Sequence, residues 1–162
     1  MTEAVKVREA GTGDLPFLFA LYCDVRGPEV SAWGWPAPQC DAFLRMQFDA
    51  RQRSYLAAYP QAADQIISSH GENIGRRLTA VTPGGMCLVD IALLAAYRNQ
   101  GIGTQLIRQL MEDCDATGRM LRLQVLRGNP AQRLYHRLGF RETDSDAEAI
   151  YIEMTRAPEP RR

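Results

Sequence analysis

The chain has 162 residues, of which 46% are hydrophobic and 23% are charged, and its formal net charge is zero. These values are typical of one globular domain, which we expect over residues 1–156, followed by a flexible tail over residues 157–162. Zero net charge provides no global attraction to nucleic acid or to an anionic membrane, so neither is an expected partner. The apolar runs have the length of strands and no apolar leader is visible, so we expect a cytoplasmic protein without a membrane span.

The cysteines and histidines do not form a metal-binding pattern. The chain contains four cysteines and two histidines, and no two of the cysteines are close in sequence (Cys23, Cys40, Cys87 and Cys114). Structural zinc sites and disulfide frameworks both use closely spaced cysteines. We therefore expect buried, reduced thiols and no metal.

Alternation and helical periodicity predict the elements of the first half of the chain. Asp14 is a candidate helix cap, and Gly27-Pro28 is a candidate helix end. In chain order we expect a strand at residues 5–8, a helix from Asp14 to about Gly27, an irregular loop to Gln39, a second helix over residues 41–59, and three strands over residues 65–69, 74–81 and 86–94.

A glycine-bearing turn follows the third of these strands. The apolar run after Asp90 leads into residues 98–103, which contain Gly101 and Gly103, and then into an amphipathic helix over residues 102–117. The first amides of a helix have no intrahelical acceptor, and the helix dipole makes this end positive. Glycine permits positive φ and close approach of an anion. The turn therefore predicts a phosphate or pyrophosphate site, although two glycines before a helix also suit a plain tight turn.

The segment after this helix predicts a strand, a short helix and a further strand. Residues 119–126 alternate between apolar and polar side chains, as a strand does. Asn129 is a good helix cap and Pro130 suits the first helical position, so a short helix is expected to run to Leu138 and stop at Gly139. Phe140 begins the next strand. The predicted fold class is α/β, with a mixed sheet and parallel strands on either side of the helix at residues 102–117.

Two motifs in this order resemble those of the GNAT superfamily of acetyl-CoA-dependent N-acetyltransferases. The first is Arg-x-x-Gly-x-Gly, which begins at Arg98, and the second is an Asn-capped helix that carries Leu134-Tyr135 and closes at Gly139-Phe140. The predicted element order also matches that superfamily over nearly the whole chain. The resemblance implies a central mixed, twisted sheet flanked by helices, in which a splayed pair of parallel strands forms the acetyl-CoA cleft.

The resemblance also implies which residues bind acetyl-CoA. Backbone amides of Ile91, Ala92 and Leu93 would hold the pantetheine arm and the thioester carbonyl. The pyrophosphate would lie along the glycine turn, at Arg98, Asn99, Gln100, Gly101, Ile102, Gly103 and Thr104. Asn129 corresponds to the cofactor-contacting asparagine of the family. The spacing to Leu-Tyr is one residue shorter here, so Gly128 is an alternative for that position and Asn129 is equally well explained as a helix cap.

The catalytic residues implied by the resemblance are less complete. Tyr135 corresponds to the general acid that protonates the departing CoA thiolate, and its helical spacing also suits a core position. Gln124 stands where some members have a basic glutamate, and an amide cannot accept that proton. Asp90 is the best remaining carboxylate for a general base, with Glu72 behind it, and Asp90 would equally suit a structural ion pair.

The acceptor is expected to be a small-molecule or peptide amine that attacks the thioester directly, because no cysteine lies in a nucleophile motif. Trp33 and Trp35 offer flat surfaces for its binding, with Gln47 and Arg51 as polar contacts, and ordinary packing explains the tryptophans equally well. The alternative to an enzyme is an acyl-CoA sensor without turnover. Whether the chain forms a homodimer is left open by the sequence.

Overall fold

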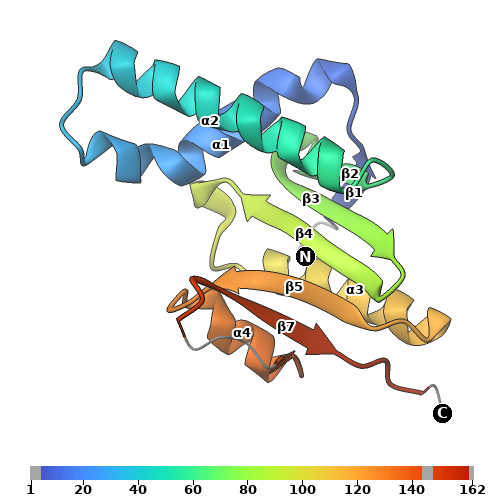
Figure 1. Cartoon of the computed structure of the whole chain (residues 1–162). Coiled ribbons are helices and arrows are strands. Elements are labelled where there is room, and N and C mark those ends of the chain that lie inside the picture. Colours follow the sequence, from blue (N-terminus) through green and yellow to red (C-terminus); the bar gives the residue numbers. More distant parts are fainter. Residues whose placement is uncertain (1–4, 144–147, 161–162) are drawn as a thin grey trace. The chain divides into compact units, whose positions relative to one another are not determined.

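The computed structural model describes residues 5–143 and 148–160 (Figure 1). The elements are β1 (Lys6–Glu9), η1 (Thr12–Asp14), α1 (Leu15–Ser31), α2 (Ala37–Ala58), β2 (Ala63–Ser69), β3 (Glu72–Thr82), β4 (Gly85–Leu93), η2 (Ala95–Tyr97), α3 (Ile102–Thr117), β5 (Leu121–Leu126), α4 (Ala131–Arg137), β6 (Arg141–Glu142) and β7 (Tyr151–Arg156). Hydrogen bonds join the strands in the order β1-β2-β3-β4-β5-β7-β6. The mixed α/β fold expected from the sequence is confirmed.

The sheet contains both parallel and antiparallel pairs. Strands β4 and β5 are parallel, with Met86, Cys87 and Leu88 in register with Leu121, Arg122 and Leu123, as predicted. Strand β5 pairs antiparallel with β7 along its whole length, and β1 pairs antiparallel with β2. The splay of the β4–β5 pair that the resemblance implies stays a prediction.

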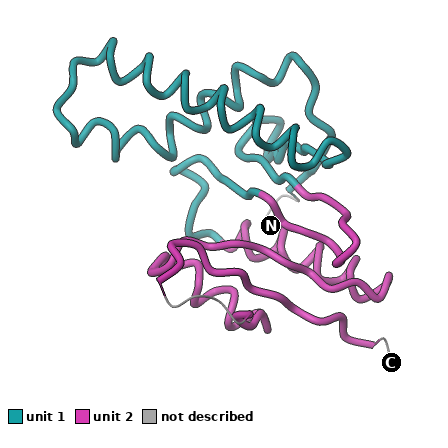
Figure 2. The backbone as a smooth tube through the Cα atoms, viewed as in Figure 1, with its two compact units in different colours: residues 1–78, 90–100 teal, residues 79–89, 101–162 magenta. Residues whose placement is uncertain are grey.

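The chain divides into two compact units, which Figure 2 shows in different colours. The first unit comprises residues 1–78 and 90–100, and the second comprises residues 79–89 and 101–162. Strands β3 and β4 each have residues in both units. The prediction of a single domain over residues 1–156 stays a prediction.

In the first unit, α1 and α2 pack against each other, and α1 continues past the predicted end at Gly27-Pro28 to Ser31 (Figure 1). A proline inside a helix removes one backbone hydrogen bond and costs about 3 kcal/mol. The last turn nevertheless buries Val30 completely, in a cluster with Cys40 and Leu44. Burial of these side chains offsets the cost of Pro28, so the predicted end was wrong.

The loop between α1 and α2 is shorter than predicted. Helix α2 begins at Ala37 rather than near Asp41, with Pro38 in its first turn, where the missing N–H costs nothing. The backbone N–H of Cys40 already donates to the carbonyl of Pro36 at 3.1 Å. The irregular segment is therefore residues 32–36 instead of 27–39.

Asp14 precedes α1 as predicted, but its side chain does not cap that helix. Its Oδ2 accepts a hydrogen bond from the backbone N–H of Gly11 at 2.8 Å, and Oδ1 lies 2.8 Å from Arg8 Nη2. The hydrogen bond from Arg8 and that from Gly11 lower the pKa of Asp14 to about 2. Asp14 therefore ties strand β1 to the turn before the helix.

In the second unit, α3 has the predicted bounds and buries one face of its surface. Strand β5 alternates as predicted, with Leu121, Leu123 and Val125 buried. The prediction of one final strand from Phe140 was wrong, because β6 spans two residues and β7 forms a further strand along β5. Strand β7 buries Ile152, Met154 and Arg156 on alternate positions.

Three other sequence expectations concern absences and thiol burial. The four cysteines are free, with Cys40, Cys87 and Cys114 buried and Cys23 partly buried. Over residues 5–143 and 148–160, no group of three or more His, Cys, Asp or Glu side chains is placed to hold a metal ion. Within the same residues, every helix is too short or too polar to cross a membrane.

Candidate functional site

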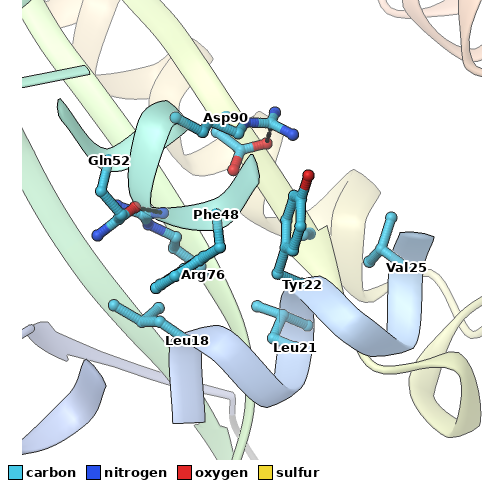
Figure 3. A pocket seen from close by; sticks show the side chains of 10 residues that line it. Leu18, Leu21, Tyr22, Val25, Phe48, Gln52, Arg76 and Asp90 are labelled. Carbon is cyan, nitrogen blue, oxygen red and sulfur yellow. Dashed lines mark hydrogen bonds and ion pairs between the residues drawn. The ribbon is translucent and has the colours of Figure 1, made fainter. Parts of the chain in front are cut away.

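A pocket lies in the first unit, walled by α1, α2, β3 and β4 (Figure 3). One part of its wall is apolar and comes mainly from the inward faces of the two helices, and another part carries charged and amide groups. The lining residues are Leu18, Leu21, Tyr22, Val25, Phe48, Arg51, Gln52, Arg76, Asp90 and Ala92. The pocket therefore combines an apolar surface with converging polar groups, as binding sites for small molecules do.

Asp90, the predicted general base, lies at the polar end of this pocket. Its side chain is 20% exposed, and Oδ1 lies 3.5 Å from Nη2 of Arg51. Burial raises the pKa of Asp90, while the charges of Arg51 and Arg76 and a hydrogen bond from the backbone of Ile91 act in the opposite direction. A carboxyl group with a raised pKa accepts a proton more readily than an exposed aspartate does. The sequence also suited Asp90 to a structural ion pair, and its pair with Arg51 is such a contact.

Arg51 is held in place by its neighbour one helical turn further along α2. Its Nε donates a hydrogen bond to the hydroxyl of Tyr55, and its guanidinium carbon lies 5.3 Å from the centroid of the Tyr55 ring. The Arg51 side chain is 41% exposed. The sequence prediction that Arg51 is a polar contact of a binding site is consistent with its place in the pocket wall, and Gln47 is not among the lining residues.

Arg76 is a buried cation that the sequence reasoning did not select. Its Nε and Nη2 donate to the two carboxylate oxygens of Asp64, each at 2.8 Å, and its Nη1 donates to Oε1 of Gln52 at 2.7 Å. Only 6% of Arg76 is exposed. The available signal was the pair Arg76-Arg77 within the predicted strand at residues 74–81, since a charge buried in a strand needs a partner.

Tyr22 stands between the apolar and polar parts of the pocket. Figure 3 shows its hydroxyl directed toward Asp90, whereas Leu18 and Leu21 lie toward the opposite end. The ring of Tyr22 packs against Phe48 with a centroid separation of 5.7 Å. The hydroxyl is thereby directed to the polar end while the ring completes the apolar wall.

The segment after β4 is fastened to α1 by Asp24, another residue that the sequence reasoning did not select. Its Oδ2 accepts a hydrogen bond from the backbone N–H of Ala95 at 2.7 Å and lies 3.3 Å from Nη2 of Arg98. Nε of Arg98 donates to the carbonyl of Leu93 at 2.9 Å. The guanidinium of Arg98, predicted to bind cofactor, thus braces the turn that follows the strand.

Glu72, the second candidate base, lies at the start of β3 in the same unit. Its Oε2 accepts a hydrogen bond from the hydroxyl of Tyr97 at 3.1 Å. It is not among the residues that line the pocket. Among the two carboxylates proposed from the sequence, Asp90 is therefore the one that lines the pocket.

The start of α3, in the second unit, has the features that an anion site requires. Gly101 has φ of +81° in the left-handed region, as its predicted role demands, and the first helical hydrogen bond runs from Gln105 N–H to its carbonyl at 3.0 Å. No side chain caps this helix and its first turn carries no acidic residue. A Cβ built on Gly101 or Gly103 would meet no heavy atom within 4 Å. The backbone amides of Ile102, Gly103 and Thr104 are therefore suited to a phosphate.

Asn129 lies just before α4 in the second unit, and Tyr135 lies within that helix. Oδ1 of Asn129 accepts a hydrogen bond from the backbone N–H of Ala131 at 2.9 Å, as a capping side chain does, although the helix begins at Ala131 rather than at Pro130. Tyr135 is 9% exposed and its ring packs against Phe140 at a centroid separation of 5.8 Å. The cofactor contact of Asn129 and the catalytic role of Tyr135 stay predictions.

Trp33 and Trp35 form an aromatic cluster with Phe43 near the turn between α1 and α2. Their ring centroids are 5.1 Å apart, and they lie 5.2 and 5.7 Å from Phe43. Both tryptophans remain about two-fifths exposed. Packing therefore accounts for part of the burial of both rings, and a role in acceptor binding stays a prediction.

The chain has a mixed sheet, a glycine turn before α3 and a pocket lined by the partly buried Asp90. The family model described as acetyltransferase (GNAT) domain matches residues 62–142, which is half of the chain. The chain therefore belongs to the GNAT acetyltransferase family, as the sequence motifs indicated, and the protein is an acetyltransferase.

Relatives and solved structures agree with this assignment. The chain is 28% identical over 144 residues to an L-methionine sulfoximine/L-methionine sulfone acetyltransferase of Pseudomonas paraeruginosa, with 85% of this chain and 80% of that protein covered. The paiA N-acetyltransferase of Thermoplasma acidophilum, solved in complex with coenzyme A, has a TM-score of 0.69 at 16% identity and covers 95% of this chain and 99% of its own. An acetyltransferase from Thermus thermophilus has a TM-score of 0.67 at 17% identity, with 97% and 99% covered. The alternative of a sensor without turnover is not favoured.

Proposed function

We propose that the protein transfers the acetyl group of acetyl-CoA to the primary amine of a small molecule by direct attack. The observation that carries this proposal is that Asp90 and Ala92 line one pocket. They are two positions apart on β4, so their side chains lie on the same face of the strand. The resemblance puts the thioester carbonyl at the amides of Ile91, Ala92 and Leu93, so an amine in this pocket would meet the donor beside a carboxylate.

Two stretches of backbone support acetyl-CoA as the donor. The amides of Ile102, Gly103 and Thr104 at the start of α3 suit the pyrophosphate, with Gly101 turning the chain ahead of them. Asn99 and Gln100 contribute the backbone that leads into this turn, and Asn99 also has a positive φ of 62°. Acetyl-CoA would supply an activated acetyl thioester to the pocket.

Asp90 would act as the general base. An amine attacks only when neutral, and an alkylammonium of pKa about 10.4 is almost fully protonated at pH 7. Burial raises the pKa of Asp90, which improves it as a proton acceptor. The N–H bond of the ammonium breaks and the proton passes to an oxygen of Asp90, so that the nitrogen lone pair can form the new N–C bond.

Tyr135 would act as the general acid when the C–S bond breaks. A phenol of pKa about 10 that protonates a thiolate of pKa about 8.5 works uphill by about 2 kcal/mol. The ring of Tyr135 is fixed against Phe140, so its orientation does not have to be established during the reaction. We expect its contribution to lie in the range of about 10²–10⁴-fold for a positioned acid.

The acceptor would be a compact amine with an apolar part. The Pseudomonas relatives are named as acetyltransferases of L-methionine sulfoximine and L-methionine sulfone, which are small. The apolar wall of the pocket offers Leu18, Leu21 and Phe48 to such a molecule. Trp33 and Trp35 are further candidates for acceptor binding, although neither lines this pocket.

Release of the CoA thiol against a panel of amines tests this proposal, with mass spectrometry of the product as a second readout. The panel holds L-methionine sulfone, apolar amino acids, their amides, polyamines and lysine-containing peptides. We expect acetyl-CoA-dependent acetylation of at least one small amine, and a large loss of kcat in Asp90→Asn but not in the exposed control Asp41→Asn. Tight binding of CoA with no acetylation of any amine would overturn the proposal.

A further inference from the structure

The carboxylate of Asp90 and the guanidinium of Arg51, at the polar end of the pocket, are close enough for one small zwitterion to contact both. Oδ1 of Asp90 and Nη2 of Arg51 are 3.5 Å apart. An α-amino acid carries its ammonium and carboxylate on a single carbon, so both groups reach such a pair together. We infer that the acceptor is an α-amino acid with a free carboxylate, which Arg51 binds while Asp90 receives the ammonium. This inference rests on the proposed function and specifies the substrate class of the same site.

Arg51 is the arginine of the pocket with capacity for a ligand carboxylate. Arg76 is 6% exposed and three of its nitrogens donate to Asp64 and Gln52. The Arg51 side chain is 41% exposed. Its Nε donates a hydrogen bond to the hydroxyl of Tyr55, and its Nη2 lies 3.5 Å from Oδ1 of Asp90 at the polar end of the pocket. A guanidinium binds a carboxylate through two parallel N–H donors, and Tyr55 fixes the plane of this one.

Acceptor binding would also activate Asp90. In the free protein the carboxylate of Asp90 is paired with Arg51, and a base that is held by a cation is a weaker base. When the acceptor carboxylate takes the guanidinium, Asp90 loses that partner at the moment when the ammonium arrives. The first proton then moves from nitrogen to Asp90, and the neutral amine forms its bond to the acetyl carbon as the C–S bond breaks. The nitrogen releases its second proton as the amide forms, which balances the proton that the CoA thiolate takes up.

The rest of the pocket selects the side chain of the amino acid. Leu18, Leu21, Val25 and Phe48 form the apolar wall, and Tyr22 directs its hydroxyl toward Asp90 (Figure 3). An apolar side chain gains by leaving water at such a surface, whereas a charged one would lose its hydration without a partner. We therefore expect apolar or weakly polar side chains to be preferred over Asp, Glu or Lys side chains.

Matched acceptors test the inference on the wild-type enzyme. L-norleucine and 6-aminohexanoic acid are isomers that differ in the position of the amine. L-norleucinamide lacks the carboxylate charge, and pentylamine lacks the carboxyl group. L-methionine sulfone and its carboxamide form a second pair. We expect kcat/KM for the α-amino acids to exceed that of the matched amide, amine and isomer by about 10- to 100-fold, the range for a hydrogen bond to a charged group.

Variants of α2 separate carboxylate binding from structure. Arg51→Gln removes the charge and Arg51→Lys keeps it without the paired donors, and Arg53→Gln is a control because Arg53 is exposed on the same helix. We expect Arg51→Gln to reduce the ratio of kcat/KM between each free amino acid and its matched amide toward one, with Arg51→Lys intermediate and Arg53→Gln like the wild type. The wild-type comparison of acceptors stands even if an Arg51 variant does not fold.

Three results would overturn the inference. The first is a kcat/KM for the amides, pentylamine or 6-aminohexanoic acid equal to that for the α-amino acids. The second is acetylation of polyamines or peptides only. The third is a preference for free carboxylates that persists in a folded Arg51→Gln. Each of these leaves the enzyme an N-acetyltransferase and so leaves the proposed function intact. Failure to acetylate any amine, with CoA bound, overturns the proposed function and this inference with it.

Discussion

The carboxylate of Asp24 on α1 accepts a hydrogen bond from the backbone N–H of Ala95 at 2.7 Å. The two residues are 71 positions apart. The same carboxylate oxygen lies 3.3 Å from Nη2 of Arg98, whose Nε is bonded to the carbonyl of Leu93. One side chain of α1 therefore fixes the path of the chain between the end of β4 and the turn at residues 98–100.

Asp24→Ala is expected to loosen this segment. Loss of the acceptor leaves the Ala95 amide without its bond, so we expect its hydrogen exchange to accelerate by about 10-fold, which corresponds to about 1.4 kcal/mol. Hydrogen exchange with mass spectrometry over residues 94–100 measures this. Asp41→Ala, an exposed aspartate on α2, is the control. Unchanged exchange in Asp24→Ala would contradict the role assigned to this contact.

Asp90 predicts the pH dependence of the reaction. The base works when deprotonated, so kcat/KM rises with pH through the pKa of Asp90. Burial raises that pKa, so the rising part of the pH profile, its acidic limb, lies at higher pH than for an ordinary aspartate. The charged and titratable groups that act on Asp90 are Arg51 and Tyr55 from α2, Arg76 from β3 and Asp64 from β2. We expect Asp90→Asn to lose this limb and about 10²–10⁴-fold of kcat. The same limb in the variant would assign the base elsewhere.

The same shift predicts how Asp90 affects stability. A folded pKa above the unfolded value means that the native state binds the proton more tightly. The contribution of Asp90 to stability is therefore fully present below its unfolded pKa and is lost as pH rises through the folded one. Urea unfolding of the wild type and of Asp90→Asn across this range gives the difference, and we expect it to shift toward favouring the variant as pH rises.

The sequence predicted elements well where local signals and tertiary packing agree. Helix α3 has an amphipathic pattern with glycines at both ends, and its bounds were predicted as they occur. The predicted end of helix α1 was too early, because burial of Val30 outweighs the local effect of Pro28. Strand β7 was missed although Ile152 and Met154 alternate. Arg156, which follows in the inward pattern, is a charge that is paired with Asp115 at 2.9 Å and interrupts the apolar alternation.

The sequence predicted those residues of the candidate site whose own side-chain chemistry suggests a role. Asp90 was selected as a carboxylate at the end of a cleft strand, and Arg51 as a polar residue on the second helix, and both line the pocket. Arg76, Gln52 and Asp24 were not selected, because each depends on a partner far away in the sequence. Such convergence is a property of the tertiary fold and leaves no pattern in spacing.

Gly103→Ala separates cofactor binding from helix stability. Gly103 lies in the first turn of α3, and a Cβ there meets no protein atom within 4 Å. Alanine is better than glycine in a helix by about 1 kcal/mol, so we expect the free energy of unfolding to rise by up to that amount. The added methyl group would meet the pyrophosphate, and calorimetry with CoA should show weaker binding. Gly27→Ala in α1 is the matched control, with stabilisation and unchanged CoA affinity.

Tyr135→Phe tests whether the hydroxyl of the buried tyrosine takes part in the reaction. The ring and its contact with Phe140 remain, so we expect CoA affinity to stay close to that of the wild type. Without a proton donor the thiolate leaves less readily, so kcat should fall while KM for the donor changes little. Steady-state kinetics with acetyl-CoA measure both constants. Turnover at the wild-type rate would show that the reaction does not need the hydroxyl of Tyr135.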